Sequence, residues 1–261
     1  MDDVAALRAG ARSRAAARTP GPPMPTQDRV LGGVPVRVYQ PDATPVVVYL
    51  HGGGFVMGDL DTHDPQVRRL AAATGASVVA VDYRRAPEHP WPAAVDDAVS
   101  VLTALSGGPL AVAGDSSGGM LAALAALRVP GLRAQLLVCP NADPTLSSPS
   151  VVSEADNGFL DPAVLREWIS WWLPSPADRS HVNLLRADLA GQPPALVVTA
   201  EHDPLRDEGE AYAARLAAAG VPVRQWREPG LRHDFPTMRD TDPAAAAAED
   251  RFLAAARELL A

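Results

Sequence analysis

Short apolar runs alternate with longer, helix-forming segments along most of the chain. The runs are rich in Val, Leu and Ala and contain few polar residues, as expected of strands that are buried on both faces of a sheet. Strands are predicted at residues 45–50, 77–82, 110–113, 135–139, 194–199 and 221–226. Helices are predicted between and after them, at residues 62–74, 92–105, 120–127, 208–219 and 243–260. This order predicts an α/β fold, with a mainly parallel central sheet and helices on both faces.

Three segments depart from this alternation. Residues 1–27 are rich in Ala and Arg and then in Pro, which predicts a short N-terminal cap helix and a linker before the main domain, residues 28–261. Residues 30–39 alternate around two glycines and predict a hairpin. Residues 141–192 contain several prolines, three tryptophans and no clear strand, so they are predicted to form a helical cap insertion over the site.

Composition and charge restrict the expected partners. The net charge of −8 and the pI near 5.2 argue against nucleic acid and anionic membrane surfaces. No apolar run approaches the ~20 residues of a membrane-spanning helix, and the acidic start of the chain lacks the apolar core of a signal peptide, so a cytoplasmic location without stable membrane insertion is expected. The single cysteine, Cys139, cannot form an internal disulfide and is predicted to be a buried core residue. The oligomeric state stays open, a homodimer included.

The segment Gly114-Asp115-Ser116-Ser117-Gly118 lies between a predicted strand and a predicted helix. A G-x-S-x-G sequence in this setting is typical of a nucleophile elbow, a sharp turn that raises the central hydroxyl above the end of a sheet. Glycines flank such a turn because side chains there would collide with the strand and the helix. Ser116 is therefore the predicted nucleophile, and its neighbour Ser117 does not occupy the central position.

Further polar residues follow the carboxyl ends of other predicted strands, where ligands bind in open parallel sheets. Asp203 follows the strand at 194–199, and His233 follows the strand at 221–226 through a loop that contains Gly230. The order Ser, Asp, His along the chain is that of an α/β-hydrolase triad. In such a triad, histidine takes the proton of the serine hydroxyl, and the carboxylate orients and stabilises the imidazole.

A glycine-rich segment, His51-Gly52-Gly53-Gly54-Phe55, follows the strand at 45–50. The oxyanion that forms during acyl transfer needs preorganised donors, and the backbone N–H groups of Gly53, Gly54 and Ser117 are predicted to supply them. His51 is expected to hold the glycine loop through a hydrogen bond. Asp115, directly before the nucleophile, is expected to support the site structurally.

Four segments together resemble the hormone-sensitive-lipase-like group of α/β-hydrolases, the bacterial family IV carboxylesterases. They are, in the family's order, His51-Gly52-Gly53-Gly54-Phe55, Tyr83-Arg84-Arg85-Ala86-Pro87-Glu88-His89-Pro90, Gly114-Asp115-Ser116-Ser117-Gly118-Gly119 and Asp203-Pro204-Leu205-Arg206-Asp207-Glu208-Gly209. The resemblance extends from about Val30 to the end of the chain. It implies the α/β-hydrolase fold, a small-molecule ester substrate, no cofactor, and Ser116, Asp203 and His233 as nucleophile, acid and base. It also implies Gly53, Gly54 and Ser117 as oxyanion donors.

The chain departs from the family's pattern at four places. Ser117 stands where the family usually has Ala, Met120 where it commonly has Asn, and Asp234 where it has Gly after the catalytic histidine. A carboxylate beside His233 is expected to raise the pKa of that histidine or to alter its loop. The family's N-terminal cap helices are longer than residues 1–27 allow, which predicts a small, partly truncated cap and a more open pocket.

Several residues have more than one interpretation. Trp168 and Trp172 have helical spacing, and they are predicted either to pack in the core of the cap or to line an acyl pocket. Phe55 is a further pocket candidate. Glu201 and Asp207 are alternatives to Asp203 as the acid, although Asp207 is the expected cap of the next helix. The remaining histidines show no metal-ligand spacing, so no metal is predicted, and they are expected to be surface or structural residues: His63, His89, His181 and His202.

The predicted reaction is the hydrolysis of carboxylic esters through an acyl-enzyme, with a preference for short to medium acyl chains that the family implies. The same triad acting on an amide, a lactone or one dedicated acylated metabolite is an alternative within the enzyme class. A non-catalytic small-molecule receptor on the same fold is the alternative from another class. Plant gibberellin receptors resemble this family but have lost the catalytic histidine, whereas this chain has His233 at that position.

Overall fold

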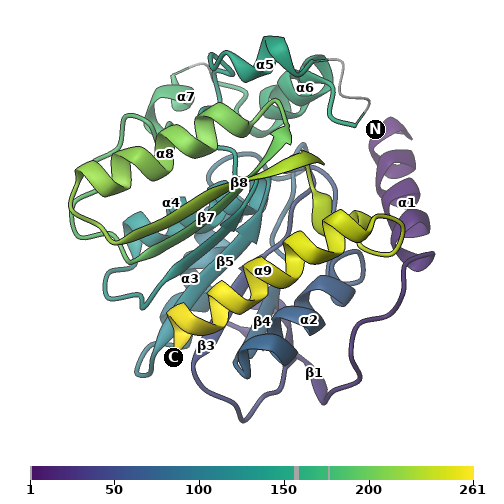
Figure 1. Ribbon diagram of the computed structural model, residues 1–261, viewed down its shortest axis with the longest axis vertical. Helices are drawn as coiled ribbons and strands as arrows, with labels where there is room; N and C mark the ends of the chain where they lie inside the picture. The colour runs from purple at the N-terminus through teal and green to yellow at the C-terminus, as the bar shows by residue number, and fades with distance from the viewer. Residues whose placement is uncertain (1, 156–158, 176) are drawn as a thin grey trace.

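The computed structural model describes residues 2–155, 159–175 and 177–261, and this part of the chain contains one eight-stranded sheet (Figure 1). The order across the sheet is β1-β2-β4-β3-β5-β6-β7-β8. The first two pairings in this order are antiparallel and the other five are parallel. The strands are β1 (Thr26–Leu31), β2 (Val34–Tyr39), β3 (Val46–Leu50), β4 (Ser77–Val81), β5 (Leu110–Asp115), β6 (Gln135–Val138), β7 (Ala195–His202) and β8 (Val223–Arg232).

Helices cover both faces of this sheet, as the sequence predicts. On one face, α2 (Asp64–Thr74) and α9 (Pro243–Leu260) lie side by side, and Figure 1 shows both in front of the strands. The other face carries α3 (Ala93–Ala104), α4 (Ser117–Arg128) and α8 (Arg206–Ala218). Within the central strand β3, Val48 and Leu50 belong to one core and Val47 and Tyr49 to the other. The strand is apolar throughout because both of its faces are buried.

The cap lies beyond the carboxyl ends of the parallel strands. Between β6 and β7 the chain forms α5 (Ser150–Ser153), α6 (Pro162–Trp172) and α7 (Asp178–His181), which Figure 1 shows at the end of the sheet to which the strand arrows point. The described residues of 141–192 contain no strand. Helix α6 begins at a proline, and the Asp161 side chain before it accepts a hydrogen bond from Ala163 N at 2.7 Å. Both features favour a helix start.

Two strand boundaries differ from the prediction, and the first of them affects the site. Strand β8 continues to Arg232 instead of ending at residue 226, so His233 follows it directly and Gly230 lies within the strand. The extension pairs with the end of β7 across a register irregularity at Ala200 and His202. Strand β1 begins at Thr26, so the predicted linker ends slightly earlier. In both places pairing with a neighbouring strand extends a segment whose own sequence suggests a loop.

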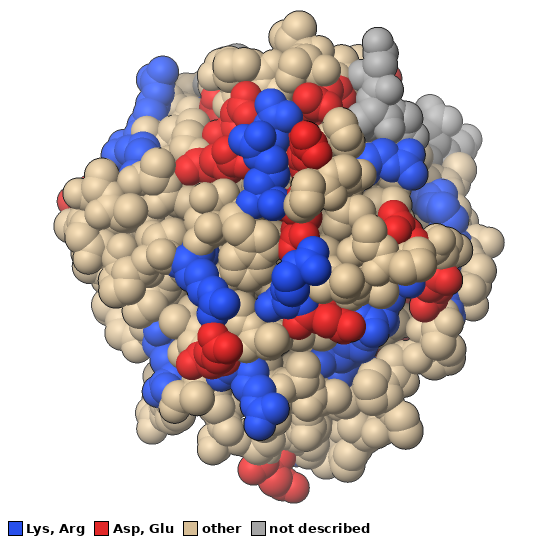
Figure 2. All heavy atoms as spheres, viewed as in Figure 1, with Lys and Arg blue, Asp and Glu red and all other residues tan. Residues whose placement is uncertain are grey.

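Acidic and basic side chains are interspersed on the face that carries α2 and α9 (Figure 2). The half-buried side chains of Arg69 and Arg239 contact Glu249 of α9 at 2.8 and 3.0 Å and connect the segments that pack on this helix. Burial raises the pKa of Glu249 above its ordinary value, against the effect of the two arginines. Among the described helices, none combines the length and hydrophobicity that crossing a bilayer requires.

Candidate active site

Ser116 lies in a tight turn between the end of β5 and the start of α4. Its φ of 54° and ψ of −125° are unusual for a residue other than glycine, and surrounding structure must hold such a backbone in place. A Cβ atom on Gly118 would lie 2.1 Å from Leu50 O, and one on Gly114 would lie 2.4 Å from Gly118 O. Only glycine fits at these two positions, which is the steric reason for the G-x-S-x-G pattern.

His233 hydrogen-bonds to both other members of the predicted triad. Its Nε2 lies 2.9 Å from Ser116 Oγ, and its Nδ1 lies 2.8 Å from Asp203 Oδ2. The other carboxylate oxygen of Asp203 accepts a hydrogen bond from Leu205 N at 2.8 Å, which fixes the carboxylate. Ser116, Asp203 and His233 are 9%, 0% and 4% exposed, so the series is shielded from water except at the serine. The neutral imidazole would donate from Nδ1 to Asp203 and accept the serine proton at Nε2.

The two alternative acids are bound elsewhere. Asp207 accepts a hydrogen bond from Ser150 N at 2.8 Å and pairs with the neighbouring Arg206. Glu201 accepts a hydrogen bond from Gly230 N at 2.7 Å and thereby joins β7 to β8. The geometry therefore favours Asp203 as the partner of the histidine.

The glycine loop is fixed to the elbow by Asp115. Both carboxylate oxygens of Asp115 lie 3.1 Å from Gly52 N, and Tyr49 OH donates to Oδ1 at 2.5 Å. Gly53 and Gly54 follow with φ values of 130° and 62°, which favour glycine, and both line the same cavity as Ser116. This arrangement fits the predicted use of their N–H groups as oxyanion donors.

His51 supports this loop from below. Its Nδ1 lies 2.9 Å from Gly52 O, its carbonyl accepts a hydrogen bond from Tyr83 OH at 2.7 Å, and the two rings stack at 4.2 Å. Burial, followed by the effect of the neighbouring His63, lowers the pKa of His51 to about 3. His51 is therefore neutral at physiological pH, which suits a structural role.

His63 belongs to the site, although its sequence context gave no reason to place it there. Its Nε2 lies 3.3 Å from Asp115 Oδ2, its Nδ1 lies 3.0 Å from Thr62 Oγ1, and it lines the cavity that contains Ser116. Burial works to lower the pKa of His63, but the Asp115 carboxylate raises it overall. His63 precedes α2 and Asp115 ends β5, so the two residues are far apart in sequence and meet only in the folded chain.

A cavity of about 680 Å³ opens above Ser116 and His233. Of the three aromatic pocket candidates, only Trp168 lines it. The predictions for Phe55 and Trp172 are corrected, because these two side chains are 1% exposed and stack on each other at 3.8 Å with an angle of 4° between their rings. They pack beneath the cavity as core residues. The cavity also has lining residues that the sequence did not suggest, from the N-terminal helix and from the segment after His233: Ala11, Arg14, Ala17, Arg18, Thr237, Asp240 and Thr241.

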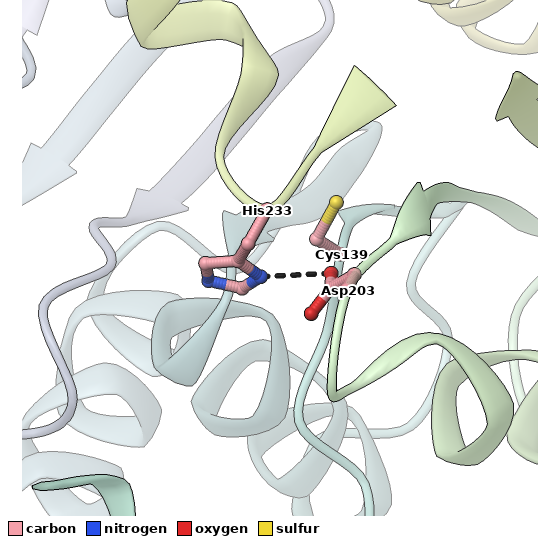
Figure 3. Close-up of side chains that lie close together, drawn as sticks. All are labelled: Cys139, Asp203 and His233. Carbon is pink, nitrogen blue, oxygen red and sulfur yellow. Dashed lines mark hydrogen bonds and ion pairs between the residues drawn. The ribbon is translucent and has the colours of Figure 1, made fainter. Parts of the chain in front are cut away.

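Cys139 lies beside the predicted acid and base (Figure 3). Its sulfur, a carboxylate oxygen of Asp203 and a ring nitrogen of His233 all lie within 4.8 Å of one another, and all three residues are buried. A metal would require a thiolate and the ring nitrogen, yet burial and the Asp203 charge raise the pKa of the thiol well above its ordinary value. His233 Nδ1 is also bound to Asp203. The cluster therefore fits a packed, neutral thiol behind the triad better than a metal centre.

Asp234 lies in the left-handed region of backbone space, with a φ of 58°, directly after His233. Its Oδ1 is buried and has no hydrogen-bond partner among the described residues. Burial and the nearby Asp115 carboxylate raise the pKa of Asp234 to about 6. Burial works to lower the pKa of His233, but Asp203, and then Asp234 and Asp115, raise it overall. The negative charge of the Asp234 carboxylate is thus the physical basis for the expectation that this residue raises the pKa of His233.

A family profile described as alpha/beta hydrolase fold matches residues 47–237 of the chain. This chain belongs to the α/β-hydrolase family. Carboxylesterase NlhH from Mycobacterium tuberculosis is 43% identical over 268 residues, which cover 92% of this chain and 84% of the relative. Ethyl acetate hydrolase from Pseudomonas putida is 37% identical over 230 residues, which cover 78% of this chain and 72% of the relative.

Solved structures show the same likeness across the whole α/β-hydrolase domain and cap. The hyperthermophilic esterase from the archaeon Pyrobaculum calidifontis has a TM-score of 0.90 and 34% sequence identity, and the match covers 99% of this chain and 94% of that one. The α/β-hydrolase fold and the resemblance to the hormone-sensitive-lipase-like esterases are thereby confirmed.

Proposed function

We propose that this α/β-hydrolase is a serine carboxylesterase that cleaves esters with short to medium acyl chains through an acyl-enzyme intermediate. The observation that carries the proposal is the hydrogen-bonded series from Asp203 through His233 to Ser116, which ends in a cavity beside the glycine loop. Relatives named carboxylesterase and ethyl acetate hydrolase support esters as the substrate class.

Each residue has a step in the proposed reaction. Ser116 Oγ attacks the ester carbonyl carbon while His233 Nε2 takes its proton, and Asp203 stabilises the imidazolium that results. Backbone N–H groups of Gly53, Gly54 and Ser117 bind the oxyanion, and losing one such donor typically costs about 2.7–4 kcal/mol of transition-state stabilisation. His233 then protonates the leaving alkoxide, removes a proton from water for attack on the acyl-enzyme, and returns that proton to the serine.

The cavity is consistent with a substrate of moderate size. Its volume of about 680 Å³ lies within the range of sites for small organic ligands. One part is apolar, with Leu165 and Trp168 from α6 and Met57 from the glycine loop. An acyl chain of a few carbons would be buried against these side chains, whereas a long chain would extend beyond them.

Hydrolysis of a 4-nitrophenyl ester series from acetate to palmitate tests this proposal. We expect the highest kcat/KM among the short esters and a fall of about 10⁶-fold in kcat for Ser116→Ala, which removes the nucleophile. Ser106→Ala changes an exposed serine outside the cavity and serves as the matched control. Faster cleavage of palmitate than of butyrate would contradict the chain-length proposal, and a Ser116→Ala variant as active as the control would contradict the mechanism.

A further inference from the structure

The four arginines of the N-terminal segment divide into two pairs with different surroundings. Arg8 donates to the carbonyl oxygens of Val56 and Ala86 at 2.9 and 3.0 Å, and it pairs with Glu88 at 2.7 Å. Arg12 pairs with Asp59 at 2.5 Å. These contacts fix α1 (Asp2–Ala16) to the main domain, beside the end of the sheet where the cap lies (Figure 1). The first pair therefore has a structural explanation.

The second pair, Arg14 and Arg18, lines the cavity that contains Ser116 and His233. Neither forms an ion pair with any described residue, although acidic residues outnumber basic ones 31 to 23 in this chain. Among the described residues Arg14 has no hydrogen-bond acceptor, and Arg18 has one long bond, 3.3 Å to Thr62 O. Each guanidinium carries five N–H donors, so most of the donors on these two groups are available.

The lining of the cavity contains two kinds of side chain. Met57, Leu165 and Trp168 are apolar, whereas the two arginines, Thr62, Thr237 and Thr241 are polar. A hydrocarbon beside Arg14 and Arg18 would leave the two guanidinium groups without partners, whereas an anionic group would pair with them.

Three carboxylates also line the cavity, and among the described residues none of them forms an ion pair with Arg14 or Arg18. Asp115 is held by Tyr49, Gly52 and His63 beneath the nucleophile. Asp240 accepts a hydrogen bond from the backbone N–H of Thr19 at 2.7 Å. Burial and Asp115 raise the pKa of Asp234 to about 6, against smaller effects of His233, His63 and Arg18, so this carboxylate is mostly ionised at pH 7 and interacts with Arg18 without forming an ion pair with it.

We infer that Arg14 and Arg18 are specificity-determining residues that select esters carrying a carboxylate group near the scissile bond. This inference rests on the proposed carboxylesterase function and narrows its substrate class. A carboxylate placed between two planar guanidinium groups accepts charge-assisted hydrogen bonds, which are shorter and stronger than neutral ones. The α1 helix then contributes to substrate binding, as well as covering part of the cavity.

Two pairs of chromogenic or titratable substrates test the inference, each pair differing only in one charge. The first pair is 4-nitrophenyl hydrogen glutarate and its methyl ester at the free carboxyl, which place the charge on the acyl side. The second pair is 4-acetoxybenzoate and its methyl ester, which place it on the alcohol side. The measured quantity is the ratio of kcat/KM for the charged ester to that for the neutral one.

In at least one pair, we expect a ratio of about 10 or more for the native protein at low salt, since hydrogen bonds to charged groups contribute this much. The ratio should fall toward 1 in Arg14→Gln/Arg18→Gln, which keeps length and polarity, and should fall in about 0.5 M NaCl, which screens exposed charges. Arg133→Gln removes an exposed arginine outside the cavity and should keep the native ratio.

The possible results separate this inference from the function on which it rests. If the folded native protein hydrolysed neither neutral ester, that result would contradict the carboxylesterase function itself. Hydrolysis of the neutral esters with ratios near or below 1 in both pairs would overturn the substrate class alone. A ratio that stays high in the double variant, or that falls equally in Arg133→Gln, would overturn the role of Arg14 and Arg18.

Discussion

Replacing Asp234 by Asn tests the electrostatic account of the base. The Asp234 carboxylate follows His233 directly, and its negative charge contributes to raising the pKa of the histidine. His233 must be neutral to take the serine proton, so activity falls as pH drops through the pKa of this residue. Removing the charge lowers this pKa and moves the acid limb of the kcat/KM profile to lower pH. Asn tolerates the positive φ of 58° at this position, so the backbone is preserved.

The size of the shift follows from Coulomb's law. Side-chain charges on adjacent residues lie about 6–8 Å apart, and an effective dielectric constant of about 20, which suits charges within a protein, gives about 2.1–2.8 kcal/mol. That energy equals about 1.5–2 pKa units. Because the pKa of Asp234 is itself raised to about 6, its carboxyl is only partly ionised where the histidine titrates. We therefore expect the acid limb to move down by about one unit.

The assay is the pH dependence of kcat/KM for a neutral short-chain ester, measured from about pH 5 to pH 8 at constant ionic strength. Asp42→Asn removes an exposed carboxylate from the turn that follows β2 and should leave the acid limb of the profile in place. An acid limb that moves to higher pH in Asp234→Asn, or that does not move at all, would refute the assignment of this charge to His233.

Three further substitutions have defined outcomes. Gly54→Ala should lower kcat/KM by about 10²–10³-fold, because its Cβ would lie 2.1 Å from Trp168 Cε3 and displace an oxyanion donor. Phe55→Ala should lower the free energy of unfolding in urea by about 3–5 kcal/mol, since it removes a buried ring stacked on Trp172. Glu208→Gln should reduce, by at least about 1.4 kcal/mol, the loss of unfolding free energy that we expect in the native protein between about pH 4.5 and 7.5.

The sign of the last effect follows from burial. Burial raises the pKa of Glu208 well above its ordinary value, despite hydrogen bonds from the N–H groups of Ala142 and Asp143. The unfolded chain therefore releases this proton first as pH rises, and stability is full below the ordinary pKa and decreases above it. Equal pH dependence in Glu208→Gln and the native protein would contradict this account, and Glu167→Gln, an exposed site, is the control.

Matched controls decide the other two substitutions. Gly33→Ala also places alanine at a positive φ, 83°, but no atom lies within 4 Å of its Cβ. If both glycine variants lost activity equally, general destabilisation would explain the Gly54→Ala result, and the role of Gly54 in binding the oxyanion would be contradicted. Phe159 lines the cavity and is 46% exposed, so Phe159→Ala should change kcat/KM with little change in stability. Comparable losses of stability in the two phenylalanine variants would contradict the placement of Phe55 in the core.

Most of the strands, and the closeness of Ser116, Asp203 and His233, could be predicted from the sequence because both depend on local patterns. Each buried parallel strand is a continuous apolar run, and the elbow has glycines wherever a Cβ would collide with backbone. The residues that follow these strands must lie at one edge of the sheet, so Ser116, Asp203 and His233 could be brought together without a structure. The end of β8 was predicted less well, since its extension depends on pairing with β7 and not on its own composition.

The lining of the cavity could not be predicted in the same way, because it depends on how separate segments pack. Phe55 and Trp172 are large aromatic residues in the right segments, yet the choice between cavity and core depends on the angle at which α6 crosses the glycine loop. His63, which precedes α2, meets Asp115 at the end of β5. Nothing in the sequence of the N-terminal segment distinguishes arginines that contact the main domain from those that face the cavity.

Activity and substrate selectivity depend on different parts of the chain. The catalytic groups lie in motifs whose geometry is fixed by local backbone constraints, so few sequences can supply them. Arg14, Arg18 and Asp234 lie outside those constraints, on α1, just after it and directly after His233, in segments that line the cavity without forming the turn around Ser116. Substitutions at these positions can change which ester is bound, or the pH at which it is cleaved, while the nucleophile and its base keep their geometry. Differences in substrate choice among such hydrolases should therefore concentrate in the cap and in the segment after the histidine.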